Sequence, residues 1–110
     1  MSFHLSAEEG SCRVEGPILY ARLRNNAGDF ISTELDLNRY LGNDNGRFHW
    51  DGVNFFETAE PGSVTFSIEG GSQVPVLRAR LASPDGEYHD ADVNLDERII
   101  NEDGHFTFQA

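Results

Sequence analysis

The chain has 110 residues, 38% of them hydrophobic, and carries 19 acidic residues against eight arginines and no lysine, for a formal net charge of −11. A chain of this length and composition is expected to fold as one compact domain, residues 1–110, rather than to remain disordered. Its negative charge repels polyanions, which argues against nucleic acid and anionic membrane surfaces as partners.

The first predicted element is a β-strand over residues 18–23, where apolar side chains occupy every second position, as a half-buried strand requires. Turn residues follow at 25–28. A second strand is predicted to lead into Leu35 and Leu37. This order of strand, turn and strand favours an all-β fold.

A single turn of helix is predicted next, at residues 37–41, because its apolar residues have helical spacing but are too few for a long helix. A β-hairpin then reverses at Asn45-Gly46, a dipeptide that accepts the positive φ angles of a two-residue turn. After the turn, Phe48 and Trp50 alternate and are predicted to face inward.

The rest of the chain repeats this series. With a shift of 58, residues 17–50 overlie residues 75–108 with 10 identities, and Asp103-Gly104 takes the place of the first hairpin turn. With a shift of 52, residues 2–11 overlie residues 54–63. The chain is therefore a tandem duplication. Since each half alone is too small to bury a good core, the halves are expected to pack together and to exchange strands.

The single cysteine, Cys12, rules out a disulfide within the chain and leaves a cysteine-based zinc site without its ligands. The first ten residues lack the basic start and apolar run of a secretory signal, and no stretch reaches the length of a membrane span. We expect a cytoplasmic protein with no membrane insertion, with export by a non-classical route left open.

The sequence lacks the common motifs of catalysis and of cofactor binding. The sequence contains no G-x-G phosphate loop, no G-x-S-x-G and no H-E-x-x-H, and the region around Gly46 does not fit a calcium loop. We therefore expect no enzyme, no cofactor and no bound metal. A carboxylate pair of the glycosidase type stays open among 19 acids, because a sequence gives no distances.

Amides, carboxylates and small hydroxyls recur at repeat-equivalent places, and together they suit a neutral polyol, since they can donate to and accept from adjacent sugar hydroxyls. Singly, turn chemistry explains several of them. One copy and its flanks supply Asn43, Asn45, Asn54, Glu57, Thr58 and Ser83, and the other supplies Ser2, Ser6, Asn26, Asn101 and Asp103.

The segments "ELDLNRYLGNDNGRFHW", "NFFETAE" and "DVNLDERIINEDGHFTF" closely resemble the cyanovirin-N homologue family of lectins, and the similarity covers nearly the whole chain. The resemblance implies an elongated, pseudo-twofold all-β fold, in which each half is a three-stranded sheet plus a hairpin and the hairpins are exchanged. One half would comprise about 1–39 plus 97–110, the other about 40–96. It also implies binding of high-mannose glycans, especially α1-2-linked mannose, at up to two sites without metal.

Carried over by position, the resemblance implies two groups of binding residues. The central site would comprise Gly42, Asn43, Asn45, Asn54, Glu57 and Thr58, with a rim over 82–86 that includes Ser83 and Asp85. The terminal site would comprise Ser2, Ser6, Arg24, Asn26, Asn101, Glu102 and Asp103.

Three of these positions depart from the family pattern, because Gly42 and Arg24 stand where the founding member has glutamates, and Pro84 stands where it has a gating arginine. These changes could weaken sugar binding at either site or alter its preference for one sugar over another. Two alternatives to a lectin remain: a duplicated β-domain that has lost sugar binding and serves as an interaction module, and a carbohydrate-active hydrolase.

The resemblance also implies that the disulfide positions of the founding member correspond to Ala7, Leu23, Ala59 and Leu81, which are apolar in this chain, as suits a reducing compartment. Gly52 replaces a hinge proline of the founding member. Because proline stiffens such a connection and favours domain swapping, we expect mainly monomer.

Overall fold

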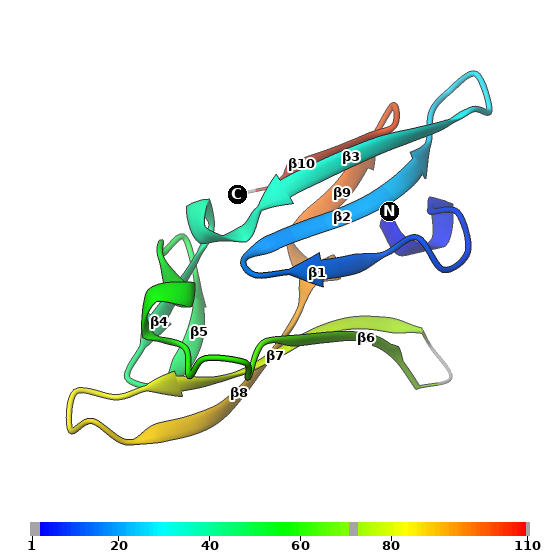
Figure 1. Cartoon of the computed structure of the whole chain (residues 1–110). Coiled ribbons are helices and arrows are strands. Elements are labelled where there is room, and N and C mark those ends of the chain that lie inside the picture. Colours follow the sequence, from blue (N-terminus) through cyan, green and yellow to red (C-terminus); the bar gives the residue numbers. More distant parts are fainter. Residues whose placement is uncertain (1–2, 71–72, 110) are drawn as a thin grey trace.

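The computed structural model describes residues 3–70 and 73–109, and within these ranges its regular structure is β-strands joined by single turns of 3-10 helix, labelled η (Figure 1). The all-β prediction is thus confirmed. No helix among the described residues is long and apolar enough to cross a membrane.

The strands form two three-stranded antiparallel sheets and two separate hairpins. The first copy of the repeat contains η1 (Phe3–Ser6), β1 (Arg13–Glu15), β2 (Ile18–Arg24), β3 (Phe30–Asp36), η2 (Leu37–Arg39), β4 (Leu41–Asp44) and β5 (Arg47–Trp50). The second contains η3 (Phe55–Thr58), β6 (Thr65–Glu69), β7 (Val74–Ala82), β8 (Tyr88–Asn94), η4 (Leu95–Glu97), β9 (Ile99–Glu102) and β10 (His105–Phe108).

The strands and turns predicted from alternation lie where expected. The 18–23 strand falls within β2, and its apolar positions 19, 21 and 23 are buried. Both hairpin turns have the predicted positive φ angles, 52° and 91° at Asn45-Gly46 and 49° and 89° at Asp103-Gly104. These angles match a type I′ turn, whose twist suits two paired strands.

The short helical turns at η2 and η4 each begin at an N-cap side chain. Asp36 Oδ1 accepts from the backbone N–H of Asn38 at 3.0 Å, and Asn94 Oδ1 accepts from that of Asp96 at 2.9 Å. Caps of this kind satisfy backbone donors that the turn leaves unpaired. The other two turns, η1 and η3, were not predicted.

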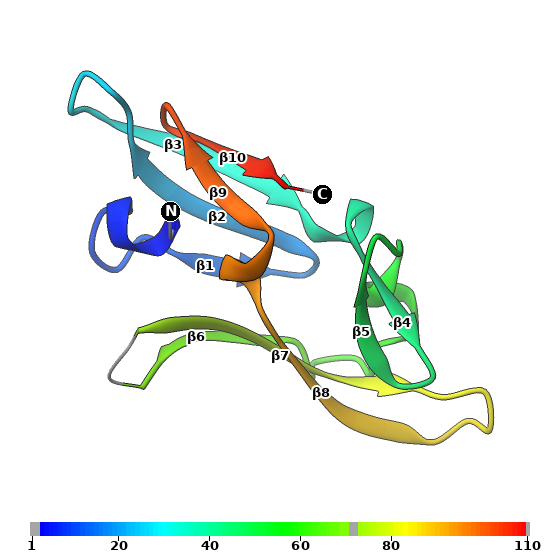
Figure 2. The same ribbon diagram turned by 180° about the vertical axis from the view of Figure 1, so that it is seen from behind.

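The hairpins are exchanged between the two halves. Hairpin β4–β5 follows the first sheet in sequence but contacts β8 and η3, whereas β9–β10 contacts β3 and η1. Figures 1 and 2 show each hairpin beside the sheet of the opposite copy. This is the exchange of hairpins that the resemblance to the family implied.

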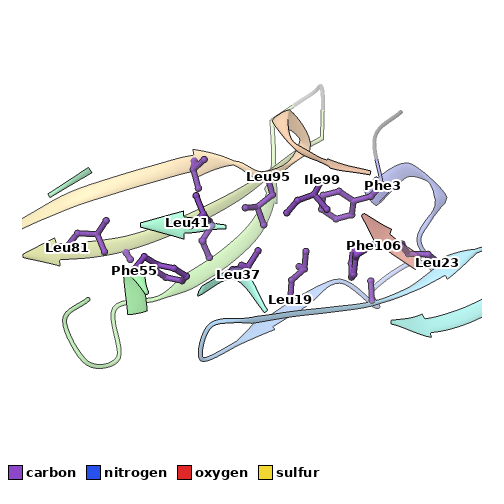
Figure 3. Packing of buried hydrophobic residues seen from close by; sticks show 14 residues of the cluster. Phe3, Leu19, Leu23, Leu37, Leu41, Phe55, Leu81, Leu95, Ile99 and Phe106 are labelled. Carbon is purple, nitrogen blue, oxygen red and sulfur yellow. The ribbon is translucent and has the colours of Figure 1, made fainter. Parts of the chain in front are cut away.

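One continuous apolar core joins the halves (Figure 3). Leu19 and Leu77 from the sheets and Phe3 and Phe55 from the helical turns are fully buried. Because repeat-equivalent residues meet in one cluster, neither half has a complete core of its own, and the two are expected to unfold together.

The positions of the family's disulfides are paired by backbone and packing. Ala7 lies opposite Leu23, and Ala59 lies opposite Leu81, each pair in an isolated antiparallel bridge. Both leucines are fully buried. Apolar contacts therefore hold η1 and η3 to their sheets where the founding member is expected to have crosslinks.

The molecule is elongated, with principal extents of 50 × 26 × 20 Å. The turn after β2 and the tip of β9–β10 lie at one end, and the turn after β7 and the tip of β4–β5 lie at the other (Figures 1 and 2). The two predicted sites are thus at opposite ends of the protein.

Candidate functional site

The tip of hairpin β9–β10 is anchored by the side chain of Asn101. Its Nδ2 donates to Ser6 Oγ at 2.9 Å and to the carbonyl oxygen of Arg24 at 2.9 Å. Its Oδ1 accepts from the backbone N–H of Gly104 at 2.8 Å. One side chain thus joins η1, the end of β2 and the hairpin turn, three segments that build the terminal site.

The tip of hairpin β4–β5 is anchored in the same way by Asn43. Its Nδ2 donates to Thr58 Oγ1 at 2.9 Å and to the carbonyl oxygen of Ala82 at 2.6 Å, while its Oδ1 accepts from Gly46 N at 2.8 Å. Both amide hydrogens are used within the protein. Asn43 and Asn101 therefore position the sites, and their side-chain amides have no N–H to offer a ligand.

At the terminal site, the structure brings the described predicted residues together. Asp103 Oδ1 accepts from the backbone N–H of Asn26 at 2.8 Å, which ties the hairpin tip to the turn after β2. Arg24, Asn26, Glu102 and Asp103 are exposed, and Ser6 is partly buried. Ser2, also predicted here, lies outside the described residues.

Beside this site is a pocket of about 210 Å³, lined by Leu5, Ser6, Ala7, Arg24 and Phe30. Leu5 and Phe30 were not among the predicted residues. Phe30 begins β3 and pairs with Arg24 of β2, but nothing in the sequence shows that it lines a pocket together with η1.

At the central site, Asn54, Glu57 and Thr58 are exposed on and before η3. Asn54 has a left-handed backbone, with φ 63°, a conformation that asparagine tolerates better than most residues. Asn45 is exposed at the hairpin tip, where its Nδ2 donates to Asp44 Oδ1 at 3.3 Å. These polar side chains are all open to solvent.

Two positions of the central site differ from expectation. Gly42 is buried, and a Cβ at this position would meet the backbone of Gly52 and Val53 at 3.0 Å, so it presents no surface to a ligand. Pro84 occupies the place of Asn26 in the repeat and has no N–H. The contact that ties Asp103 to Asn26 therefore has no counterpart here.

The rim of the central site is ordered by Ser83, whose hydroxyl donates to Asp85 and to the carbonyl oxygen of Glu87. The hydrogen bond from Ser83, together with the backbone N–H of Glu87, lowers the pKa of Asp85 below its ordinary value. His89 Nε2 lies 3.0 Å from Ser83 Oγ, and a Cβ on Gly46 would stand only 2.7 Å from the His89 ring.

Glu87 and His89 were not predicted for this rim. With Asp85, they place one ligating atom each within 4.8 Å of one another, and all three side chains are exposed. Strand alternation could have placed His89 on the face of β8 that meets hairpin β4–β5.

Replacing Ser83 with alanine should raise the pKa of Asp85 toward its ordinary value, because the largest cause of the lowering is removed. Carboxyl-detected NMR titration measures this. The contribution of Asp85 to stability, present above the unfolded-state pKa and lost as pH falls through the lowered folded-state value, should shrink accordingly. Ser67→Ala is the matched control. It removes a hydroxyl bonded to Glu69 and should leave Asp85 unchanged; an unchanged Asp85 in both variants would contradict this assignment.

Known proteins share the sequence and the fold of this chain. The family model described as "CVNH domain" matches residues 3–107. A cyanovirin-N homolog from Neurospora crassa is 44% identical over 109 residues, covering 96% of each chain. The solution structure of the homologue from Gibberella zeae is 43% identical, with a TM-score of 0.87, and covers 99% of this chain and 98% of that one.

A solved complex of microvirin with mannobiose is 26% identical to the chain, with a TM-score of 0.83, and the match covers 97% of both chains. The family model over residues 3–107 and the relative of 44% identity show the family as well as the fold. The chain belongs to the CVNH family, the cyanovirin-N homologues, whose members are lectins and not enzymes.

Proposed function

We propose that this protein binds carbohydrate at up to two metal-free sites, and that at one or both of them it recognises high-mannose glycans through α1-2-linked mannose. Its family and the mannobiose complex of microvirin support the sugar partner. The observation that carries the proposal is the repeated asparagine anchor. At both ends of the molecule, Asn43 or Asn101 holds a polar hairpin tip against a helical turn and the end of a strand.

The groups around each anchor suit vicinal hydroxyls. At the central site, Glu57 and Thr58 offer acceptors, and Asn45 and Asn54 offer amides, all on exposed side chains. A carboxylate beside an amide can accept from one hydroxyl while the amide donates to the next. Because the anchor fixes the segments in advance, little ordering is needed on binding.

Each site is expected to bind weakly on its own, since every sugar hydroxyl exchanges a hydrogen bond with water for one with protein. The sites lie at opposite ends of a molecule 50 Å long, so one short sugar cannot reach both. Strong binding then depends on avidity for branched or clustered glycans. We propose that the protein acts as a monomer with two sites.

Titration of the ¹⁵N-labelled protein with α1-2-mannobiose should shift amide resonances of residues 43–58 or 101–103, because the ligand changes hydrogen bonding there. Cellobiose is the control sugar and should leave these resonances in place. Glu57→Gln should weaken binding at the central site alone, since it replaces one exposed acceptor oxygen by an NH2 donor and removes the charge; Glu9→Gln, also exposed, should have no effect. Absence of any shift at millimolar mannobiose would contradict the proposal.

The competing candidate is a duplicated β-domain without sugar binding. Burial of Gly42 and the missing N–H of Pro84 favour it at the central site, because both remove groups that could face a ligand. It predicts no shifts with any mannose oligosaccharide in a protein whose spectrum is otherwise that of a folded chain.

A further inference from the structure

The two ends of the molecule carry opposite chemistry at repeat-equivalent positions. Glu57, on η3 at the central site, corresponds to Leu5 on η1 at the terminal site. Ala82, at the end of β7, corresponds to Arg24 at the end of β2. At these two positions the central site has a carboxylate and a methyl group. The terminal site has an isobutyl group and a guanidinium.

Both Leu5 and Arg24 line the terminal pocket, which has a volume of about 210 Å³. Leu5, Ala7 and Phe30 give it apolar walls, and Arg24 is the one charged residue in its lining. Leu5 is 66% exposed although it is a large apolar residue. An exposed leucine beside an aromatic ring offers a surface for the apolar face of a sugar ring.

Hydrogen-bond donors in this pocket come from Arg24. The hydroxyl of Ser6 donates to the carbonyl oxygen of Phe3 at 3.1 Å and accepts from Asn101, so its proton is already used. The guanidinium of Arg24 lies over the ring of Phe30, 5.1 Å from its centroid. Among the described residues, no carboxylate lies within ion-pair distance of Arg24, in contrast to five other arginines of the chain: Arg13, Arg22, Arg78, Arg80 and Arg98.

We infer that the terminal pocket takes a sugar that bears an oxyanion, the carboxylate of a uronic acid or a sulfate ester, while the central site takes neutral mannose. This inference rests on the proposed sugar-binding function and assigns a substrate class to one of its two sites. A planar guanidinium fork matches an oxyanion with two parallel hydrogen bonds, a fit that separate hydroxyls do not give. Leu5 and Phe30 would contact the ring.

The net charge of the protein, −11, opposes an anionic ligand at long range. At physiological salt, however, exposed charges are screened over about 8 Å. Contact with Arg24 therefore decides binding at this pocket more than the distant carboxylates do.

The test compares three monosaccharides on the full ¹⁵N-labelled chain: methyl α-mannoside, its uronate with C6 oxidised to a carboxylate, and its 6-sulfate. The two anions should shift the amides of Leu5, Ala7 and Arg24 and bind there at least about tenfold more tightly than the neutral mannoside, as charge-assisted hydrogen bonds allow. Binding of both anions indicates a general oxyanion site, and binding of the uronate alone selects the carboxylate.

Arg24→Gln should remove this preference, and so should Leu5→Glu, which gives the pocket the carboxylate of the central site. Arg47→Gln is the matched control, since Arg47 is exposed on the other exchanged hairpin, and it should leave the preference intact. Equal affinity for the anions and the neutral mannoside, or an unchanged preference in Arg24→Gln, would overturn the inference.

α1-2-Mannobiose in the same titration series separates this inference from the proposed function. Mannobiose shifts at residues 43–58 without any anion preference at Leu5 and Arg24 would overturn the inference and leave the lectin function standing. Anion binding without mannobiose shifts would support the inference and overturn the neutral-mannose part of the function. A folded chain that binds none of the sugars would overturn both.

Discussion

Replacing Asn101 with alanine should lower the free energy of unfolding by roughly 2–4 kcal/mol, because three hydrogen bonds are lost at once. The backbone N–H of Gly104 would lose its partner in a partly buried place, and the exposed carbonyl oxygen of Arg24 would lose one as well. Urea denaturation followed by Trp50 fluorescence measures the change. Asn43→Ala should behave alike, since it makes the same three bonds in the other half.

Asn26→Ala is the control for this prediction, because its side chain is exposed in the turn after β2 and surface substitutions of this kind usually stay within about 0.5 kcal/mol. If Asn101→Ala were no more destabilising than Asn26→Ala, the anchor assignment would be wrong. The loss of stability in Asn101→Asp should lie between those of Asn101→Ala and Asn26→Ala. A carboxylate keeps the acceptor for the N–H of Gly104 but loses both donated hydrogen bonds.

This role changes how binding data on the two asparagines should be interpreted. A lost sugar signal in Asn101→Ala would follow from displacement of the hairpin tip as readily as from a lost contact with sugar. Exposed residues such as Glu57 at the central site report on contact more directly, because they can be changed while the anchor stays in place.

Local patterns were enough to predict β2, β3, β7 and β8, the two hairpins and the helical turns η2 and η4, but not β1, β6, η1 or η3. The alternation in residues 18–23 and 76–81 specifies a buried face, and Asn45-Gly46 and Asp103-Gly104 specify the hairpin turns; these depend on neighbours in the sequence. The resemblance to the family supplied the exchange of hairpins, which no local pattern contains.

The chemistry of the sites was less predictable, because it depends on contacts between distant residues. Asn101 bonds to Ser6 and Arg24, which are 95 and 77 residues away, so its anchoring role has no local signal. Gly42 is buried because the backbone of Gly52, in the connection between the halves, packs against it. The pocket wall made by Phe30 likewise appears only once η1 packs beside the end of β2.

Replacing Gly52 with alanine should lower the free energy of unfolding by roughly 2–3 kcal/mol, the upper part of the range for overpacking. A Cβ at this position would stand 2.8 Å from both Cα and N of Gly42 and 3.2 Å from the carbonyl oxygen of His49. All three are backbone atoms, so no side chain can turn aside to make room, and the connection between the halves must shift.

Val53→Ala is the matched control for Gly52→Ala, because Val53 is the next residue and is 58% exposed, and it should leave stability nearly unchanged. Size-exclusion chromatography with light scattering gives the second measurement. The unaltered chain is expected to be mainly monomeric. In Gly52→Ala, relief of the clash by opening the connection would raise the share of a domain-swapped dimer, because the exchanged hairpin can pair with a second copy by the same contacts. A variant as stable and as monomeric as Val53→Ala would show that the approach of Gly42 and Gly52 does not constrain the halves.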